Sequence, residues 1–308
     1  MSDTWDEDAW TRDLARAFPA GDLVALGIGD DAAWLRAVPE GWLVATDVLV
    51  DGVHGIVAEV GAAALASKAV AVNVSDFAAM GARPRVLVAG LVLPRQNARA
   101  YLEGVRDGLL AATQAHGLSL VGGDTNVADG PLTIAVTMLG TPGRGGVLTR
   151  AGARVGDRLS VTGPLGGSLA GRHLAPASRV EAGEILALSG RVHAMMDISD
   201  GLARDLPRLA RASGVGARID GERIPIHDDV PPGVADRVQR ALCDGEDFEL
   251  LLAHAPLDVA TREALARLGA APVEIGVVTP PEAGLVLVRG GRAQAWPRGG
   301  FDHLAPLP

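Results

Sequence analysis

The chain has 308 residues, of which 48% are hydrophobic, and its formal net charge is -9 at pH 7. This length accommodates two domains with sizeable cores, whereas the acidic balance and the lack of a Lys/Arg-rich run argue against extended nucleic-acid binding. No stretch approaches the ~20 apolar residues of a membrane span, and the acidic N-terminus lacks the order of a signal peptide. The single cysteine, Cys243, excludes an intrachain disulfide and a cysteine-based zinc site. We therefore expect a cytoplasmic enzyme with no nucleic-acid or membrane partner.

The first half of the chain predicts strands that alternate with helices. The expected elements are a strand over 42–50, a helix over 62–80, a strand over 85–93, a helix over 98–116, and strands over 118–121 and 132–140. Both helices have apolar residues three and four positions apart, and the first is expected to end before Gly81. The strand over 118–121 is expected to run into a loop formed by Gly122-Gly123-Asp124-Thr125.

The Pro/Gly-rich stretch 141–146 marks the expected boundary between two domains, residues 1–146 and 147–308. Beyond it we expect strands over 158–162, 192–198, 248–253 and 285–288, and helices over about 200–212 and 257–268. Pro207 lies inside the first of these helices and should kink it. Alternating strands and helices in both halves predict an α/β or α+β class.

Six short acidic motifs, most of them beside Gly, Ser, Thr or Asn, are spread along the chain. They are Gly29-Asp30-Asp31, Thr46-Asp47, Asn73-Val74-Ser75-Asp76, Gly122-Gly123-Asp124-Thr125, Asp197-Ile198-Ser199-Asp200-Gly201 and Gly245-Glu246-Asp247. Carboxylates beside small residues suit oxygen-liganded cations such as Mg2+ held against phosphate. An acidic protein that handles polyanionic nucleotides also needs cations between the two. Together the motifs predict a nucleotide–metal site.

Each motif also has a simpler explanation when it is taken alone. Asp47 ends an apolar strand and could merely turn into a loop. Asp76 lies in a weakly amphipathic helix and could point to solvent instead of lining a site with Asn73. The Gly-Gly-Asp-Thr motif could be an ordinary glycine turn rather than an anion-binding nest. Ser199 or Asp200 could simply cap the following helix. The joint occurrence of the motifs favours the site.

No rival site is visible in the sequence. A Walker-type motif and the protein-kinase signatures are absent, and the histidines form no His-x3-His pair. His54, just beyond Asp51-Gly52-Val53, is the histidine that we expect near a ligand, although a surface-loop histidine would look the same.

Taken in order, the motifs resemble those of thiamine-monophosphate kinase, a family within the aminoimidazole ribonucleotide synthetase superfamily. The resemblance also rests on Asp51-Gly52-Val53-His54, Leu148-Thr149-Arg150 and Gly299-Gly300-Phe301-Asp302-His303. It covers almost the whole chain and implies a two-domain α/β (α+β) protomer, whose N-terminal domain binds ATP and Mg2+ and pairs its sheet into a barrel across a homodimer. The implied reaction is the ATP-dependent phosphorylation of thiamine monophosphate to thiamine diphosphate by direct in-line transfer.

The resemblance also implies roles for individual residues. The implied metal ligands are Asp31, Thr46, Asp47, Asp76, Asp124, Asp197 and Asp200. The implied ATP contacts are Gly123, Asp124, Arg150 and Ser199, and the implied contacts to thiamine monophosphate are His54, Glu246 and Phe301. Several Mg2+ ions would screen the repulsion between the two phosphates. No residue would act as a general base, because the acceptor phosphate is already ionised.

Some features depart from the family pattern. Ala45 stands where the family often has a hydroxyl residue, and the chain looks shorter between Gly171 and Asp197. Two other functions stay open: another ATP-dependent synthetase of the superfamily, and a non-catalytic nucleotide-binding dimer. A selenophosphate-type synthetase would need a reactive cysteine near the N-terminus, and Cys243 lies far from it.

Overall fold

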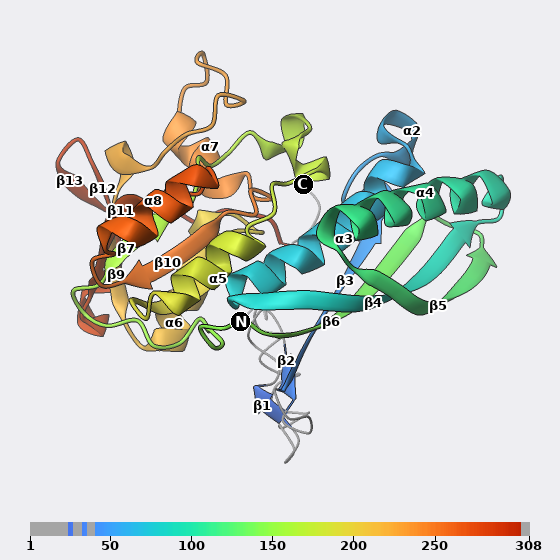
Figure 1. Ribbon diagram of the computed structural model, residues 1–308. Coiled ribbons are helices and arrows are strands. Elements are labelled where there is room, and N and C mark those ends of the chain that lie inside the picture. The colour runs from blue at the N-terminus through green and yellow to red at the C-terminus, as the bar shows by residue number, and fades with distance from the viewer. Residues whose placement is uncertain (1–23, 27–32, 36–40, 303–308) are drawn as a thin grey trace, which may run out of the picture.

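The computed structural model describes residues 24–26, 33–35 and 41–302, which form two lobes (Figure 1). The sheet of the first lobe has six described strands in the order β1-β2-β3-β6-β4-β5. They are β1 (Val24–Leu26), β2 (Ala33–Leu35), β3 (Trp42–Val50), β4 (Ala82–Pro94), β5 (Ser119–Ala128) and β6 (Thr133–Pro142). The helices are α2 (Val57–Val60), α3 (Ala62–Ala79) and α4 (Ala98–His116). The longer two, α3 and α4, lie over one face of this sheet.

The second lobe holds a sheet of seven described strands in the order β13-β12-β9-β11-β7-β10-β8. They are β7 (Arg158–Val161), β8 (Val192–Asp197), β9 (Gly216–Asp220), β10 (Leu250–His254), β11 (Val273–Thr279), β12 (Leu285–Arg289) and β13 (Arg292–Ala295). The helices are α5 (Val180–Leu188), α6 (Leu202–Ser213), α7 (Arg237–Cys243) and α8 (Val259–Arg267), with 3-10 turns η1 (Ser168–Ala170), η2 (Arg172–Leu174), η3 (Gly221–Arg223) and η4 (Pro281–Ala283). Parallel pairs (β4 with β5, β9 with β12) occur in otherwise antiparallel sheets, so the predicted mixed α/β class is confirmed.

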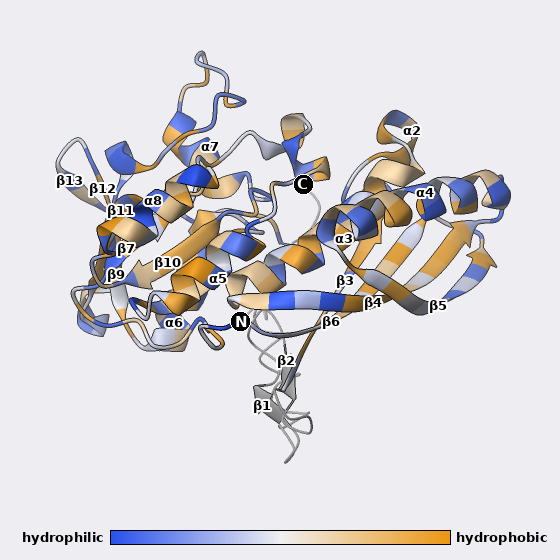
Figure 2. Ribbon diagram, in the orientation of Figure 1, coloured by the Kyte–Doolittle hydropathy of each residue, from blue (hydrophilic) through white to orange (hydrophobic). Residues whose placement is uncertain are grey.

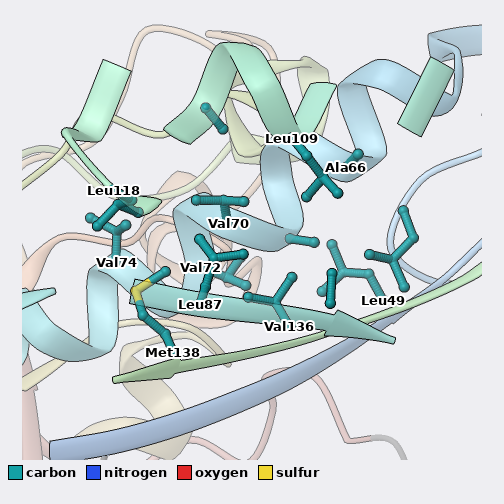
Figure 3. Close-up of a cluster of buried hydrophobic side chains, with 14 of the residues drawn as sticks. Leu49, Ala66, Val70, Val72, Val74, Leu87, Leu109, Leu118, Val136 and Met138 are labelled. Atoms are coloured by element: carbon teal, nitrogen blue, oxygen red, sulfur yellow. The ribbon is translucent and has the colours of Figure 1, made fainter. Parts of the chain in front are cut away.

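The apolar periodicity of the first half places its core where the pattern predicts. The strand over 42–50 and the helix over 98–116 have the predicted bounds, and α3 ends one residue before its prediction. Figure 3 shows Val70 and Val74 of α3 and Leu109 of α4 above Leu87 and Val136 of the sheet. Figure 2 shows hydrophobic residues along the strands of this sheet. The core of the first lobe therefore lies between α3, α4 and one face of the sheet.

Helix α3 also packs against the second lobe, where it meets α5 at very short range. A Cβ on Gly183 of α5 would lie 2.1 Å from the carbonyl oxygen of Ala78, so only glycine permits this approach. Ala78 and Ala79 pack with Leu186 of α5 in a shared apolar cluster. Helix α5 was not predicted from the sequence, and Gly183 in its middle is an unfavourable residue for a helix interior. Here it serves the contact between the lobes.

The predicted loop at Gly122-Gly123-Asp124-Thr125 is wrong, because β5 continues through it to Ala128. Gly123 pairs with Ala89 of β4, and a Cβ on Gly123 would lie 2.1 Å from the Ala89 carbonyl oxygen. The glycine therefore permits close approach of two parallel strands rather than a turn. An irregularity in the β4–β5 register lies just before this stretch.

Pro207 lies inside α6, as predicted, and its missing N–H leaves the carbonyl of Ala203 without its helical donor. The indole Nε1 of Trp296 donates a hydrogen bond to that carbonyl oxygen at 2.9 Å. Trp296 also packs against the apolar core of the second lobe. The side chain thus replaces the hydrogen bond that the proline removes.

A membrane span would need a longer or more apolar helix than any found among the described residues.

We expect Trp296→Phe to lower the free energy of unfolding by about 1–2 kcal/mol, because the buried Ala203 carbonyl loses its donor. In a Pro207→Ala background the restored N–H of residue 207 supplies a donor, so the same substitution should be milder by on the order of 1 kcal/mol. Urea unfolding of the four proteins of this cycle measures both values. If Trp296→Phe lowers the free energy of unfolding equally in the two backgrounds, the indole N–H does not replace the N–H that Pro207 lacks.

Candidate active site

The predicted acidic residues of the two lobes meet at helix α3. Ser75 of α3 donates a hydrogen bond from Oγ to Oδ2 of Asp197 at 2.6 Å, and both side chains are buried. Asp197 is the last residue of β8, and Asp76 follows Ser75 on the helix. The contact therefore joins the motif Asn73-Val74-Ser75-Asp76 of the first lobe to the strand-end motif that begins at Asp197 in the second lobe.

Asp47 lies on the sheet face that packs against α3. It pairs with Val136 of β6, which is fully buried, and it stands between the buried residues Ala45 and Leu49 on its own strand. Because side chains alternate along a strand, Thr46 lies on the opposite face. There its hydroxyl donates to the carbonyl oxygen of Val136 at 3.0 Å. Of the two side chains in this motif, only that of Asp47 faces the helix.

Asp124 belongs to the outer face of the same sheet. It pairs with Gly90 of β4, Gly90 pairs with Ala135 of β6, and Ala135 pairs with the exposed Val48 of β3. Directly paired residues share a face, so the Asp124 side chain and that of Asp47 project to opposite faces. On the outer face, Oδ2 of Asp124 accepts a hydrogen bond from Nδ2 of Asn126 at 2.8 Å.

Helix α3 crosses β3 with its C-terminal end, which carries Asp76, over the start of that strand. Near the end of the helix, Phe77 contacts Gly140, where a Cβ would come within 2.3 Å of the ring, and Gly140 pairs with the start of β3. Near its beginning, Lys68 reaches the loop that follows β3. The two elements therefore run antiparallel, with Asp76 next to Phe77 on the helix.

The segment that follows β8 connects three separate parts of the second lobe. The carbonyl oxygen of Ser199 accepts a hydrogen bond from the backbone N–H of Glu246 at 2.6 Å, and that of Asp200 accepts one from the N–H of Phe301 at 3.0 Å. Neither Ser199 nor Asp200 caps α6, because the N-cap is Gly201 and receives no side-chain bond. The simple capping explanation of this motif is therefore wrong, and four predicted site residues lie together.

Asp200 belongs to a network of opposite charges at the start of α6. Its Oδ2 lies 2.6 Å from Nη1 of Arg208, which also donates to Oδ1 of Asp205 at 2.8 Å. Burial and the charge of Asp200 raise the pKa of Asp205, against the opposing charges of Arg208 and Arg150. Arg150, a predicted ATP contact, therefore lies within electrostatic reach of this acidic pair.

The predicted thiamine-phosphate side is joined by a residue that sequence reasoning missed, Lys68 of α3. Its Nζ donates to the carbonyl oxygen of His54 at 2.7 Å and to Oε1 of Glu246 at 2.5 Å. Nδ1 of His173 lies 3.6 Å from Oε2 of the same glutamate. Burial, with the charges of Lys68 and Arg172, lowers the pKa of His173 to about 4, so this histidine is neutral at pH 7. One signal could have found Lys68: it is the sole lysine of the chain.

Asp247, next to Glu246, is a buried carboxyl group. Its Oδ1 accepts hydrogen bonds from the N–H of Gly166 at 2.9 Å and from Nη2 of Arg172 at 3.2 Å, while Oδ2 has no hydrogen-bond partner among the described residues. Burial raises the pKa of Asp247 to about 7, although Arg172 opposes the rise. The carboxyl group therefore titrates near neutral pH.

The donor atoms around Asp76 fit a hard cation. Asn73, one helical turn earlier, is fully buried, and its Oδ1 has no hydrogen-bond partner among the described residues. A carboxamide oxygen beside a carboxylate is a donor set that Mg2+ accepts. In the part of the chain that the structure describes, however, no three His, Cys, Asp or Glu side chains form a group that could hold a metal ion. Asp31 and His303 lie outside the described residues.

A groove of about 570 Å³ lies between the end of α4 and α5. Its charged lining includes Arg83, Arg85, Arg144 and Glu184, and Nε of Arg83 lies 2.5 Å from Oε1 of Glu184. None of the predicted site residues lines this groove. It is therefore not part of the candidate active site.

We expect Asp247→Asn to make stability less dependent on pH. The folded protein keeps the Asp247 proton up to about pH 7, whereas the unfolded chain releases it near the ordinary value of 3.8, so unfolding of the parent protein is favoured as pH rises between the two. The stability of the variant relative to the parent should therefore grow by about 2 kcal/mol from pH 5 to pH 7 and level off above. Urea unfolding of both proteins across pH 4–8 measures the difference in their free energies of unfolding. A difference that does not change with pH would contradict the prediction.

Comparison with known proteins identifies the family. Residues 29–141 match the family model of the AIR synthase related protein N-terminal domain, and residues 135–288 match that of the C-terminal domain. The thiamine-monophosphate kinase of Rhodopirellula baltica is 41% identical over 267 residues, which cover 83% of this chain and 83% of that protein. The thiamine-monophosphate kinase of Escherichia coli is 38% identical over 312 residues, which cover 92% and 93%.

Solved structures agree with these matches. The structure of AaThiL complexed with AMPPCP and TMP is 28% identical with a TM-score of 0.82 and covers 97% of each chain. Thiamine-monophosphate kinase from Stenotrophomonas maltophilia is 33% identical with a TM-score of 0.71, covering 92% of this chain and 96% of that one. The resemblance drawn from the motifs is confirmed, and the chain belongs to the thiamine-monophosphate kinase family of AIR synthase related proteins.

Proposed function

We propose that this chain phosphorylates thiamine monophosphate to thiamine diphosphate at the expense of ATP. The observation that carries the proposal is the similarity, over 97% of the chain, to a structure described as complexed with AMPPCP and TMP. The contact between Ser75 and Asp197 supports it, because it brings acidic motifs of both lobes to one place. Use of ATP makes the cytoplasm the compartment that we propose.

The two substrates would lie on either side of the segment that follows β8. We assign the ATP contacts to Gly123, Asp124, Arg150 and Ser199, and the thiamine monophosphate contacts to His54, Glu246 and Phe301. The hydrogen bond from Glu246 to Ser199 supports part of this assignment, since it joins one residue of each group, and the bond from Phe301 to Asp200 lies next to it.

The chemistry would be direct in-line transfer of the γ-phosphoryl group. The acceptor phosphate is already ionised at neutral pH, so no side chain has to remove a proton. What the chain would supply is position and charge: Arg150 would offset charge on the polyphosphate, and the carboxylates would hold the cation. Mg2+, when bound, would screen the repulsion between the two phosphates. The residues that we propose to hold Mg2+ ions are Asp31, Thr46, Asp47, Asp76, Asp124, Asp197 and Asp200. Because the side chains of Thr46 and Asp124 lie on the sheet face opposite Asp47, they would hold a different ion from Asp47.

A direct assay tests this function. Purified protein is incubated with ATP, Mg2+ and thiamine monophosphate, and thiamine diphosphate is quantified by chromatography after oxidation to its fluorescent derivative. Thiamine in place of thiamine monophosphate serves as the control acceptor, because it lacks the phosphate. Formation of thiamine diphosphate only from the monophosphate supports the proposal, and its absence with both acceptors overturns it.

The residues favour this function over a synthetase that needs a reactive thiol. Cys243 ends α7 and accepts a hydrogen bond at Sγ from Nε2 of Gln239 at 3.1 Å. Burial raises the pKa of the Cys243 thiol, which makes the nucleophilic thiolate scarce. A non-catalytic nucleotide-binding dimer is the remaining alternative, and the same assay excludes it if product forms.

The outer face of the first sheet supports a second copy as partner. No described helix covers this face (Figure 1), and it carries apolar side chains such as the exposed Val48 and Val92. An uncovered apolar sheet face of this kind marks an interface. We propose that residues 1–146 form the dimerising, ATP- and Mg2+-binding domain, that residues 147–308 form the second domain, and that two such faces close a barrel in a homodimer.

We expect Asp76→Asn to reduce turnover by about 100-fold or more, because a cation ligand is lost while the fold is kept. Thermal stability should be unchanged or slightly higher, since neighbouring carboxylates repel each other without a cation. Steady-state assays over a Mg2+ titration and a melting curve test both parts. Asp129→Asn, whose side chain is 89% exposed, is the matched control. Near-parent activity of Asp76→Asn at low Mg2+ would remove Asp76 from the ligand set.

We expect the parent protein to be a dimer at micromolar concentration and Val92→Asp to be a monomer, because the new charge would be buried in the shared barrel. Val155→Asp, at a 58% exposed position of the second lobe, should leave the dimer intact. Size-exclusion chromatography with light scattering measures the three masses. A monomeric parent protein, or a dimeric Val92→Asp, would contradict the barrel.

A further inference from the structure

Lys68 is unusual in both composition and location. It is the sole lysine among the 28 Lys and Arg residues of the chain. It lies in the first half of α3, and its side chain is fully buried. Burial lowers its pKa, while the charge and hydrogen bond of Glu246 oppose that fall. A buried ammonium group is retained in proteins when a specific partner needs it.

The partners of Lys68 come from both lobes. His54 follows β3 in the first lobe, and its carbonyl oxygen accepts a hydrogen bond from Nζ at 2.7 Å. Glu246 precedes β10 in the second lobe, and its Oε1 accepts one at 2.5 Å. These are two of the three residues that we assign to thiamine monophosphate. One ammonium group therefore fixes where the two assigned contacts lie relative to each other.

The backbone at Glu246 shows that its position is closely constrained. Its φ is 52°, in the left-handed region that residues other than glycine rarely adopt, and Phe248 has a φ of 53°. The N–H of Glu246 donates to Ser199 at 2.6 Å, which fixes the backbone. Lys68 fixes the side chain, and Nδ1 of the neutral His173 lies 3.6 Å from the other carboxylate oxygen, too far for a hydrogen bond. Both the main chain and the carboxylate are thus held by residues outside their own loop.

The chemistry of the contact explains why a lysine is kept where every other basic residue is arginine. An ammonium group presents three donors from one compact atom, and here two of them reach acceptors on different chain segments. A guanidinium group is planar and bulkier and favours paired bonds to one carboxylate. A fully buried position between a carbonyl and a carboxylate suits the ammonium group.

We propose that Lys68 is a positioning residue: it couples the His54 loop to Glu246 across the lobes, so that the pocket for thiamine monophosphate is complete only when both are held. It acts through these two partners and does not itself transfer phosphate. This inference rests on the proposed function, and it deepens that function by naming the residue that orders the acceptor side of the site. The ATP side has separate contacts and should not depend on Lys68.

Kinetics of substituted proteins test the coupling. Lys68→Met should raise KM for thiamine monophosphate by about 10- to 100-fold, as expected for the loss of a charge-assisted hydrogen bond, with KM for ATP nearly unchanged. Lys68→Gln, which keeps a donor for His54, should lose less, and it carries the test if Lys68→Met does not fold. In a Glu246→Gln background Lys68→Met should add little, because the partner is already altered. Val70→Ala, a core substitution on the same helix, controls for lost stability alone.

A sole lysine also permits a direct spectroscopic test. Protein labelled with 13C at the lysine side chain, made without a lysine-containing tag, gives one lysine Cε signal. Thiamine monophosphate should shift that signal, an ATP analogue should not, and Glu246→Gln should shift it in the free protein. A signal that responds to neither thiamine monophosphate nor Glu246→Gln overturns the inference.

The outcomes separate this inference from the proposed function. If the parent protein makes no thiamine diphosphate, both fail. If the parent is active but Lys68→Met and Lys68→Gln bind thiamine monophosphate as it does, or lose affinity for both substrates equally, the inference alone fails. The inference is supported if Lys68→Met raises KM for thiamine monophosphate alone and adds little further rise in the Glu246→Gln background.

Discussion

The packing of helix α3 against both lobes is the constraint on which the rest of the structure depends. One stripe of this helix runs through Lys68, Ser75 and Ala78, which lie two and then about one helical turn apart. Each of the three meets the second lobe: Lys68 at Glu246, Ser75 at Asp197, and Ala78 at Gly183 of α5. The opposite stripe fills the core of the first lobe. Any shift of α3 therefore moves polar contacts and apolar packing together.

The charges at the junction follow from the same arrangement. Three acidic residues of the second lobe are paired with cations: Glu246 with Lys68, Asp200 with Arg208, and Glu249 with Arg179, whose Nε and Nη2 donate at 2.8 and 2.5 Å. Burying such groups is unfavourable unless they are paired. The pairs hold the acidic motifs in place, although the chain as a whole carries a charge of -9.

Local pattern was sufficient to predict much of the fold from the sequence. Uninterrupted apolar periodicity gave β3 and α4 their observed bounds. Two of the failures lie at a glycine in a close backbone contact, Gly183 of the missed α5 and Gly123 of the wrongly predicted loop, and a contact with a distant segment cannot be seen in local sequence. The elements β9, β11 and α7 were also missed. The site followed the same rule. The acidic motifs and the family were readable, whereas Lys68 was not, since its partner Glu246 lies in the other half of the chain.

The segment 296–302 binds along helix α6 at several points. Trp296 bonds to Ala203, Phe301 to Asp200, and Arg204 forms a 2.7 Å ion pair with Asp302. This segment leaves the ribosome long after α3 and α6 have been synthesised. Domains fold in the order in which they emerge, so a nascent chain can form the strands of both sheets before the contacts of segment 296–302 with α6 exist. Premature termination just before Trp296 would leave all the described strands in the chain, and the loss would fall on the contacts to α6 and on Phe301, which we propose to contact thiamine monophosphate.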